Sequence, residues 1–333
     1  MDPVRAIADA VLYEGYVLWP YRRSALKNQR RWTFGGVYPR AHSDGREDDP
    51  WTMQTQCLLE AADHASVEVR VRFLQVVRRQ MMRSAGGRRE PVDALTVDGE
   101  RYLSWSEAVE REISSEPLSP ATLVGYEAAI PIAIEPGTEE EPLGDGSVGA
   151  IARSCAGLDG AVTVAAERLA DDLFRLTVRI SNTTPCAGGD REHALERTFC
   201  STHTVLNARG GAFVSLADPP PELAAAARAC RNEGAWPVLV GEDGERHTLL
   251  SSPIILEDYP RIAPESPGDL FDGGEIDQML ILNILTLTDE EKEEMRATDP
   301  RTREILERTE ALNPDELMKL HGAIREFGLA RRA

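Results

Sequence analysis

Residues 67–77 read VEVRVRFLQVV, and the first seven of them alternate between apolar and charged side chains. Val67, Val69, Val71 and Phe73 occupy one phase of this alternation, while a glutamate and two arginines occupy the other. A period of two residues is typical of a strand that buries one face and exposes the other. The stretch therefore predicts a half-buried β-strand.

Three hairpins are predicted further along the chain. The first joins residues 95–97 to 102–103 through Asp98-Gly99, a dipeptide that tolerates the positive φ angles of a tight turn. The second and third join residues 162–164 to 173–180 and residues 236–240 to 247–250. The chain lacks both the alternation of strands with crossover helices and a glycine-rich phosphate-binding loop, so a doubly wound sheet is not predicted.

The remaining segments are mostly predicted as short helices. We expect helices over residues 2–12, 52–64, 104–113, 193–206 and 220–231, a strand over 123–134 and a loop over 135–149. The C-terminal part reads as helical from residue 276. Within it, Thr288 with Glu291 forms a capping box, and Asp299-Pro300 and Asn313-Pro314 each mark the start of another helix.

Together these elements predict an α+β fold with an antiparallel, sandwich-like β core and short helices. An irregular N-terminal arm and a C-terminal helical tail flank that core. We divide the chain into an N-terminal helix with an aromatic and basic arm (1–50), a β-rich core domain (51–255), an acidic strap rich in proline and glycine (256–275) and the helical tail (276–333).

Composition and charge narrow the class of protein. The chain has 333 residues, of which 42% are hydrophobic and 28% charged, as in a soluble globular protein. Its formal net charge of −19 argues against binding to nucleic acid or to an anionic membrane surface. No secretory signal or transmembrane stretch is expected from the hydropathy pattern, and the five cysteines are scattered without a CxxC motif. These features predict a cytoplasmic protein with free thiols.

The arm interleaves aromatic and basic side chains. Its candidate interaction residues are Trp19, Tyr21, Arg22, Arg23, Trp32, Phe34 and Tyr38. Such a pattern stacks nucleic-acid bases in some proteins, but the net charge argues against that here. Two interpretations remain: the rings pack on the core of this chain, or they anchor a protein partner, since Trp, Tyr and Arg are the usual interface anchors.

Residues 256–277, which are the strap and the first two residues of the tail, carry seven acids against one base, together with three prolines and three glycines. Too few apolar groups are present for this segment to form a core of its own, yet Tyr259, Ile262, Leu270 and Phe271 are spaced through it like anchors. The candidate interaction residues are Asp258, Tyr259, Glu265, Asp269, Phe271 and Asp272. A calcium site and a carboxylate pair for acid–base chemistry are weaker alternatives, because the acids miss the EF-hand order and nothing indicates that they are buried.

A metal site is the main alternative chemistry. Cys200 and His203 would share a face of the predicted helix over 193–206, and His247 lies on a neighbouring predicted strand. With His193 nearby, these residues would supply the three protein ligands of an open zinc or nickel site. A cysteine nucleophile with a histidine base is a further option, and a buried cysteine beside a carbonyl-bonded histidine explains the same residues without chemistry. No catalytic residue is assigned.

Two long stretches resemble a known protein family. Residues 13–39 read YEGYVLWPYRRSALKNQRRWTFGGVYP, and residues 251–301 read SSPIILEDYPRIAPESPGDLFDGGEIDQMLILNILTLTDEEKEEMRATDPR. Both are similar to an uncharacterised family found in bacterial gene clusters for nickel–iron (NiFe) hydrogenases. That family has no established activity, so the resemblance implies a context, which is the assembly or support of a hydrogenase, and no site residue.

The sequence therefore predicts a non-enzymatic accessory, assembly or interaction protein of a hydrogenase system. Its expected partner is a hydrogenase subunit or a maturation factor, bound through the arm and the strap. The first alternative is a metal-binding enzyme or metal-delivery protein that uses Cys200, His203 and His247. The second is a structural module that forms homo-oligomers through the helical tail.

Overall fold

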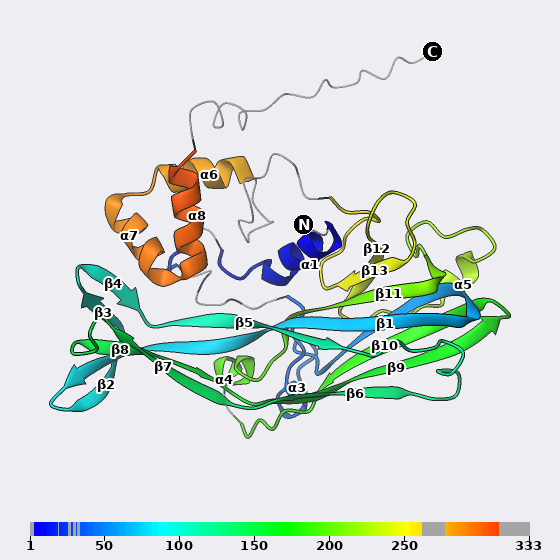
Figure 1. The fold of residues 1–333 in the computed structure, drawn as a ribbon, viewed down its shortest axis with the longest axis horizontal. Helices are drawn as coiled ribbons and strands as arrows, with labels where there is room; N and C mark the ends of the chain where they lie inside the picture. The colour runs from blue at the N-terminus through cyan, green and yellow to red at the C-terminus, as the bar shows by residue number, and fades with distance from the viewer. Residues whose placement is uncertain are drawn as a thin grey trace, which may run out of the picture.

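One very long strand, β1 (Thr52–Ala85), is the centre of the fold. The computed structural model describes residues 3–18, 20–25, 28, 31, 34–188, 190–261 and 277–312. The stretch predicted as a half-buried strand, 67–77, is the middle of β1, and its four alternating apolar residues are all buried. This prediction is confirmed, but the strand is 34 residues long and runs along much of the molecule (Figure 1).

An antiparallel, eleven-stranded sheet is built around β1. The main path runs β12-β13-β11-β1-β10-β9-β6, and β2, β5, β7 and β8 extend the sheet beside the second half of β1. The bounds are β2 (Arg88–Val92), β5 (Trp105–Ser114), β6 (Ala128–Ile134), β7 (Gly137–Leu143), β8 (Gly149–Cys155), β9 (Leu158–Ala170), β10 (Leu173–Asn182), β11 (Cys200–Val214), β12 (Trp236–Leu239) and β13 (Thr248–Ser252). A separate two-stranded sheet contains β3 (Ala94–Val97) and β4 (Glu100–Leu103).

The main hydrophobic core lies against the valine-bearing face of β1. Strands β1, β6, β9, β10 and β11 all contribute buried side chains to it. At its centre the rings of Phe73 and Phe199 stack with their centroids 4.7 Å apart, and both side chains are fully buried. Alternation along the strands is thus sufficient to bring one apolar face of each into a common core.

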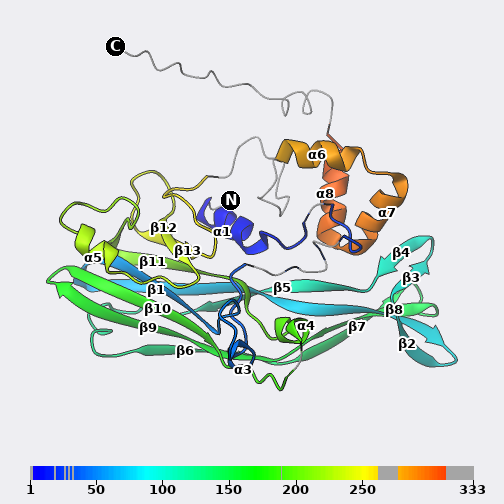
Figure 2. The ribbon, with the colours of Figure 1, turned by 180° about the vertical axis from the view of Figure 1, so that it is seen from behind.

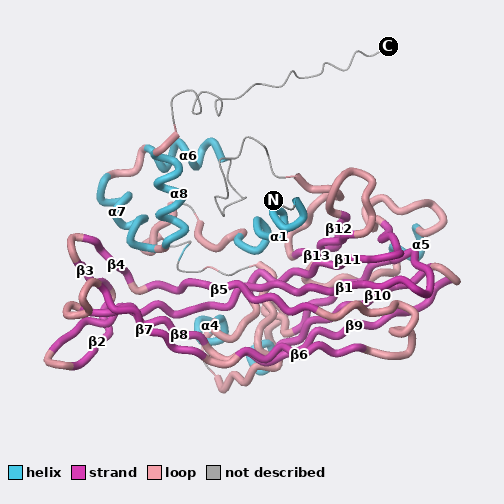
Figure 3. Tube along the Cα trace, viewed as in Figure 1, coloured by secondary structure: helices cyan, strands magenta, loops and turns pink. Residues whose placement is uncertain are grey.

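Helices cover the sheet on both sides. On one side lie α1 (Pro3–Tyr13), α6 (Asp277–Leu285), α7 (Asp289–Thr298) and α8 (Pro300–Glu310), whereas α3 (Arg40–Ser43) and α4 (Arg191–Leu195) lie on the other (Figures 1 and 2). The short α5 (Ala224–Arg228) sits at one end of the sheet. Figure 3 shows how strands dominate the body of the molecule and helices its covering layer. The predicted α+β fold with a helical tail is confirmed.

Local signals for the tail helices are also confirmed. Thr288 and Glu291 form the capping box at the start of α7, and the Asp299 side chain accepts from the Arg301 N–H at the start of α8. The helix predicted from Asn313-Pro314 lies outside the described residues. Within the described ranges, no helix is both long and apolar enough to span a membrane.

Several predicted helices and one predicted loop are strands. Residues 52–64 form the start of β1, residues 104–113 fall almost entirely in β5, and residues 135–149 contain β7. The helix predicted over 193–206 is wrong beyond α4, because β11 begins at Cys200. The helix predicted over 220–231 is shorter, at α5. In each strand, pairing with a distant neighbour outweighs local propensity. The glutamates of β5, for example, lie beside arginines of β1 and β8.

Candidate functional site

The three candidate metal ligands are not brought together. A bulge at Ser201 (φ 51°) shifts the register, so that Cys200 lies opposite Leu74 and His203 opposite Arg72 on β1. Cys200 and His203 are buried, whereas His247 is exposed in the turn that precedes β13. Among the residues that the structure describes, no group of three or more His, Cys, Asp or Glu side chains is arranged to hold a metal ion.

Burial sets the protonation of this cysteine and histidine. It raises the pKa of the Cys200 thiol to about 12, and it lowers the pKa of His203 to about 4. The His203 Nδ1 lies 3.2 Å from the carbonyl oxygen of Ser201. At neutral pH the Cys200 thiol is therefore protonated and the His203 imidazole is neutral. The pair lacks the thiolate that a cysteine nucleophile requires.

Most described candidates of the arm are used in internal contacts. Tyr21 and Tyr38 are buried, and the Arg22 guanidinium lies 2.9 Å from the Glu291 carboxylate on α7. Arg23 donates to the carbonyl oxygen of Asp93. Phe34 is the exposed exception. Trp19 and Trp32 lie outside the described residues. The arm therefore connects the helical tail to the sheet.

The first residues of the strap lie on the edge of β12. The Asp258 carboxylate accepts from the Leu239 N–H at 2.8 Å and from the Ser215 hydroxyl, and the Tyr259 N–H donates to the Leu239 carbonyl at 2.7 Å. The Tyr259 ring packs against the main core. These two candidates thus protect a sheet edge of their own chain. Glu265, Asp269, Phe271 and Asp272 lie outside the described residues.

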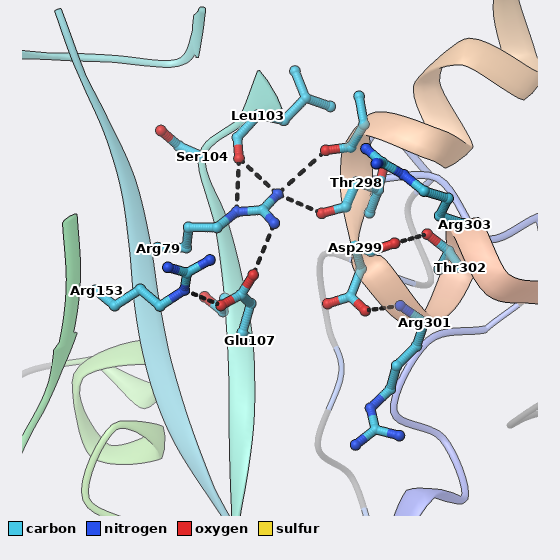
Figure 4. Close-up of polar contacts among 12 residues, drawn as sticks. Arg79, Leu103, Ser104, Glu107, Arg153, Thr298, Asp299, Arg301, Thr302 and Arg303 are labelled. Atoms are coloured by element: carbon cyan, nitrogen blue, oxygen red, sulfur yellow. Dashed lines mark hydrogen bonds and ion pairs between the residues drawn. The ribbon is translucent and has the colours of Figure 1, made fainter. Parts of the chain in front are cut away.

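A buried arginine joins the sheet to the tail (Figure 4). The Arg79 guanidinium donates to the carbonyl oxygen of Leu103, to the carbonyl oxygens of Ala297 and Thr298 at 3.2 and 2.6 Å, and to the Glu107 carboxylate at 2.8 Å. The two tail carbonyls belong to the last turn of α7, where they have no partner within the helix. Arg79 therefore caps the C-terminus of α7 with a positive charge. We call this contact the Arg79 junction.

A second set of buried polar groups extends the junction toward the arm. The Asp299 carboxylate accepts from the Tyr16 hydroxyl at 2.8 Å, and burial raises the pKa of Tyr16 well above its usual value. Arg31 donates to the Tyr16 carbonyl at 2.9 Å, and its guanidinium carbon lies 3.8 Å from the centroid of the Trp105 ring. Burial lowers the pKa of Arg31 to about 10, so the guanidinium stays charged at neutral pH. The arm, the sheet and the tail are thereby held in one arrangement.

An open cleft of about 1870 Å³ lies beside this junction. Its walls come from the arm, β1, the connection from β4 to β5 and the segment that contains α4. Arginines, carboxylates and aromatic rings line it, namely Arg23, Arg31, Arg78, Arg79, Arg101, Arg191, Asp48, Asp49, Asp93, Asp190, Glu192, Glu196, Glu294, Tyr38 and Trp105. We call it the junction cleft. It exceeds the roughly 300–1,000 Å³ of small-molecule pockets, and neither sign of charge dominates its lining.

Sequence reasoning missed Arg79, Glu107 and Arg153. Glu107 bridges the other two, since it also lies 2.9 Å from Arg153. One signal was present in the sequence: Arg79 follows Phe73 and Val77 in the apolar phase of the strand, where a charged residue needs a buried partner. The partner itself carries no local signal. No protein-family model matches the chain, and a search of curated proteins found no significant match.

Proposed function

We propose that this chain is a non-enzymatic accessory or assembly protein that binds a protein partner in the junction cleft. The observation that carries the proposal is the combination of size and lining. The cleft is too large for a typical small ligand, and it presents arginines, a tryptophan and a tyrosine between carboxylates. Those residue types are enriched at the energetic centres of protein interfaces.

Rigid walls support the same proposal. Arg79, Glu107 and Asp299 fix the position of the tail through buried hydrogen bonds, and Arg31 fixes the arm. A surface that is already ordered loses less conformational entropy when a partner binds. The cleft is therefore suited to a preformed protein surface or to an extended segment of a partner.

The partner that we propose is a hydrogenase subunit or a maturation factor. This part of the proposal rests on the resemblance of residues 13–39 and 251–301 to the hydrogenase-associated family. Parts of both stretches frame the cleft, since Arg23, Tyr38 and Glu294 belong to them and line it. The mixed lining predicts a partner surface that carries both signs of charge, so that each meets its opposite.

Two exposed residues of the cleft allow a test without disturbing the fold. Arg101 and Asp48 make no ion pair among the described residues, and both side chains face solvent. The double variant Arg101→Glu/Asp48→Lys keeps the net charge and reverses both local charges. The matched control is Arg88→Glu with Asp218→Lys, two exposed positions outside the cleft.

The experiment is quantitative affinity purification of the tagged full chain from its native cell, followed by mass spectrometry. We expect hydrogenase subunits or maturation factors with the wild-type protein and the control, and at least a tenfold lower recovery with the cleft variant, as like charges in an interface oppose binding. Absence of hydrogenase proteins from the wild-type sample contradicts the proposed partner. Equal recovery with the cleft variant contradicts the proposed surface.

A further inference from the structure

A second, smaller pocket lies beneath α1, apart from the junction cleft. Its volume is about 570 Å³, within the range of ligand-binding pockets. The first turns of α1 form one wall, β11 and β13 the floor, and the turn 241–247 the opposite wall. We call it the α1 pocket. It does not share residues with the junction cleft.

The floor presents an oriented amide. Asn207 and Thr248 are cross-strand neighbours on β11 and β13, and the Thr248 hydroxyl donates to the Asn207 Oδ1 at 2.8 Å. Thr248 is buried, so this hydrogen bond fixes the amide. The oxygen of the amide is occupied, while its NH₂ group has no acceptor among the described residues. Two N–H donors are therefore available to a ligand at the floor.

Cationic side chains of the wall fall into two groups. Arg70 and Arg72 are held by the Glu112 carboxylate, and Arg72 also pairs with Asp9. Arg5 lines the pocket and is exposed, and its guanidinium makes no hydrogen bond or ion pair within the part of the chain that the structure describes. His247 also lines the pocket and is exposed, and its imidazole makes no hydrogen bond or ion pair to a described residue. Arg5 thus keeps a full set of donors for an incoming carboxylate.

The opposite wall carries the Glu242 carboxylate, whose charge contributes to the raised pKa of Arg261. Glu245 accepts from the Glu242 N–H at 3.2 Å, which closes the turn, but the Glu242 carboxylate has no hydrogen bond or ion pair to any described residue. Gly241 gives the turn its shape: its φ is 122°, and a Cβ there would lie 2.7 Å from Glu245 Oε2. The turn therefore needs glycine at this position to hold the two glutamates as observed.

We propose that the α1 pocket binds a small zwitterion of the α-amino-acid class. The ligand carboxylate binds to Arg5 and to the Asn207 amide, and its ammonium group binds to Glu242. The charge balance favours this class, because three arginines and three glutamates line the pocket and leave it neutral overall. A ligand with a single charge would pair with only one of Arg5 and Glu242 and would lie beside the other, which has its own sign of charge, whereas a dipolar ligand pairs with both.

The test is isothermal titration of the full chain with each of the standard α-amino acids as probes. We expect at least one of them to bind at millimolar concentration or below. Its analogue without the amino group and its analogue without the carboxylate should each bind at least about tenfold more weakly, since each loses a charge-assisted hydrogen bond.

Two variants locate the binding to this pocket. Arg5→Gln and Glu242→Gln should each weaken the affinity at least about tenfold, and both side chains are exposed enough for the fold to tolerate the change. Arg88→Gln and Glu222→Gln, at exposed positions outside the pocket, should leave the affinity unchanged. The proposal is overturned if no amino acid binds or if the analogue without the amino group binds as well as the amino acid. It is also overturned if the two pocket variants bind like the wild type.

Discussion

Phe73 and Arg79 lie on the same strand but belong to opposite kinds of interior. The surroundings of Phe73 are apolar, and its ring stacks on Phe199 in a core that strands of the main sheet share. Arg79 is also buried, at 6% exposure, yet it is held by hydrogen bonds to carbonyl oxygens and a carboxylate. The single strand β1 thus contributes to two regions. The core is stabilised by buried apolar surface, and the Arg79 junction is stabilised by directional hydrogen bonds.

The difference determines how specific each region is for the segments that pack against it. Apolar burial is nearly independent of direction, so a core of valines and phenylalanines accepts any strand that offers an apolar face. Arg79 can donate to the carbonyl oxygens of Ala297 and Thr298 only at one position and orientation of α7. The core therefore supplies stability, and the Arg79 junction specifies where the tail docks.

The largest loss is expected in the core. Phe73→Ala removes a fully buried ring and leaves a cavity, so the free energy of unfolding should fall by about 4 kcal/mol. Urea denaturation followed by circular dichroism measures the change. Val148→Ala, at a valine with 41% exposure, is the control and should change stability little. A loss below about 1 kcal/mol for Phe73→Ala would contradict the assigned core.

Breaking the Arg79 junction should lower the free energy of unfolding less than Phe73→Ala does, and the effect should be confined to the tail. Arg79→Met removes the donor to three carbonyl oxygens and one of the two arginines that pair with Glu107, which costs about 3 kcal/mol. Hydrogen exchange should accelerate in α7 and α8 before it does in β10 and β11. The neighbouring Arg78→Met, at 59% side-chain exposure, is the control and should have a small effect. Uniform acceleration across the sheet would show that the tail is not a separate region.

Acid should lower the free energy of unfolding through the buried His203. His203 has a pKa of about 4 when folded and an ordinary value near 6.5 when unfolded, so the unfolded chain binds the proton first as the pH falls. Stability is therefore full above pH 6.5 and declines toward pH 4. Between pH 6.5 and pH 5 the contribution lost is about 2 kcal/mol.

The comparison of wild type with His203→Gln isolates this effect, because all other titrating groups are shared. Denaturant midpoints measured at several pH values should show a steeper decline for the wild type below pH 6.5. Parallel pH profiles for the two proteins would contradict the assignment of this titration to His203.

The smallest effect is expected at an exposed ion pair that joins β1 to β2. Arg83 and Glu90 lie 3.3 Å apart, but their side chains are 55% and 54% exposed. Arg83→Gln should change the free energy of unfolding by about 0.5 kcal/mol or less. Thermal denaturation in low and high salt measures the difference. A loss comparable to that of Arg79→Met would mean that burial does not distinguish the two arginines.

Features whose causes lie within a few residues could be predicted from local patterns. Alternation over 67–77 predicts the buried face of β1, and the Asp98-Gly99 turn forms because both residues adopt positive φ. Thr288 and Glu291 cap α7 because the two residues reach each other across one helical turn. The broad fold class follows from the same local patterns.

Tertiary structure alone decided the rest. Residues 52–64 and 104–113 are strands because distant partners complete their hydrogen bonds, and the same residues in isolation have a helical pattern. Three features join segments far apart in the chain. Asp258 and Tyr259 bond to β12, Arg79 caps α7, and Arg5 lies across the α1 pocket from the turn 241–247. Their energies arise only when both partners are in place, so no local pattern of residues encodes them.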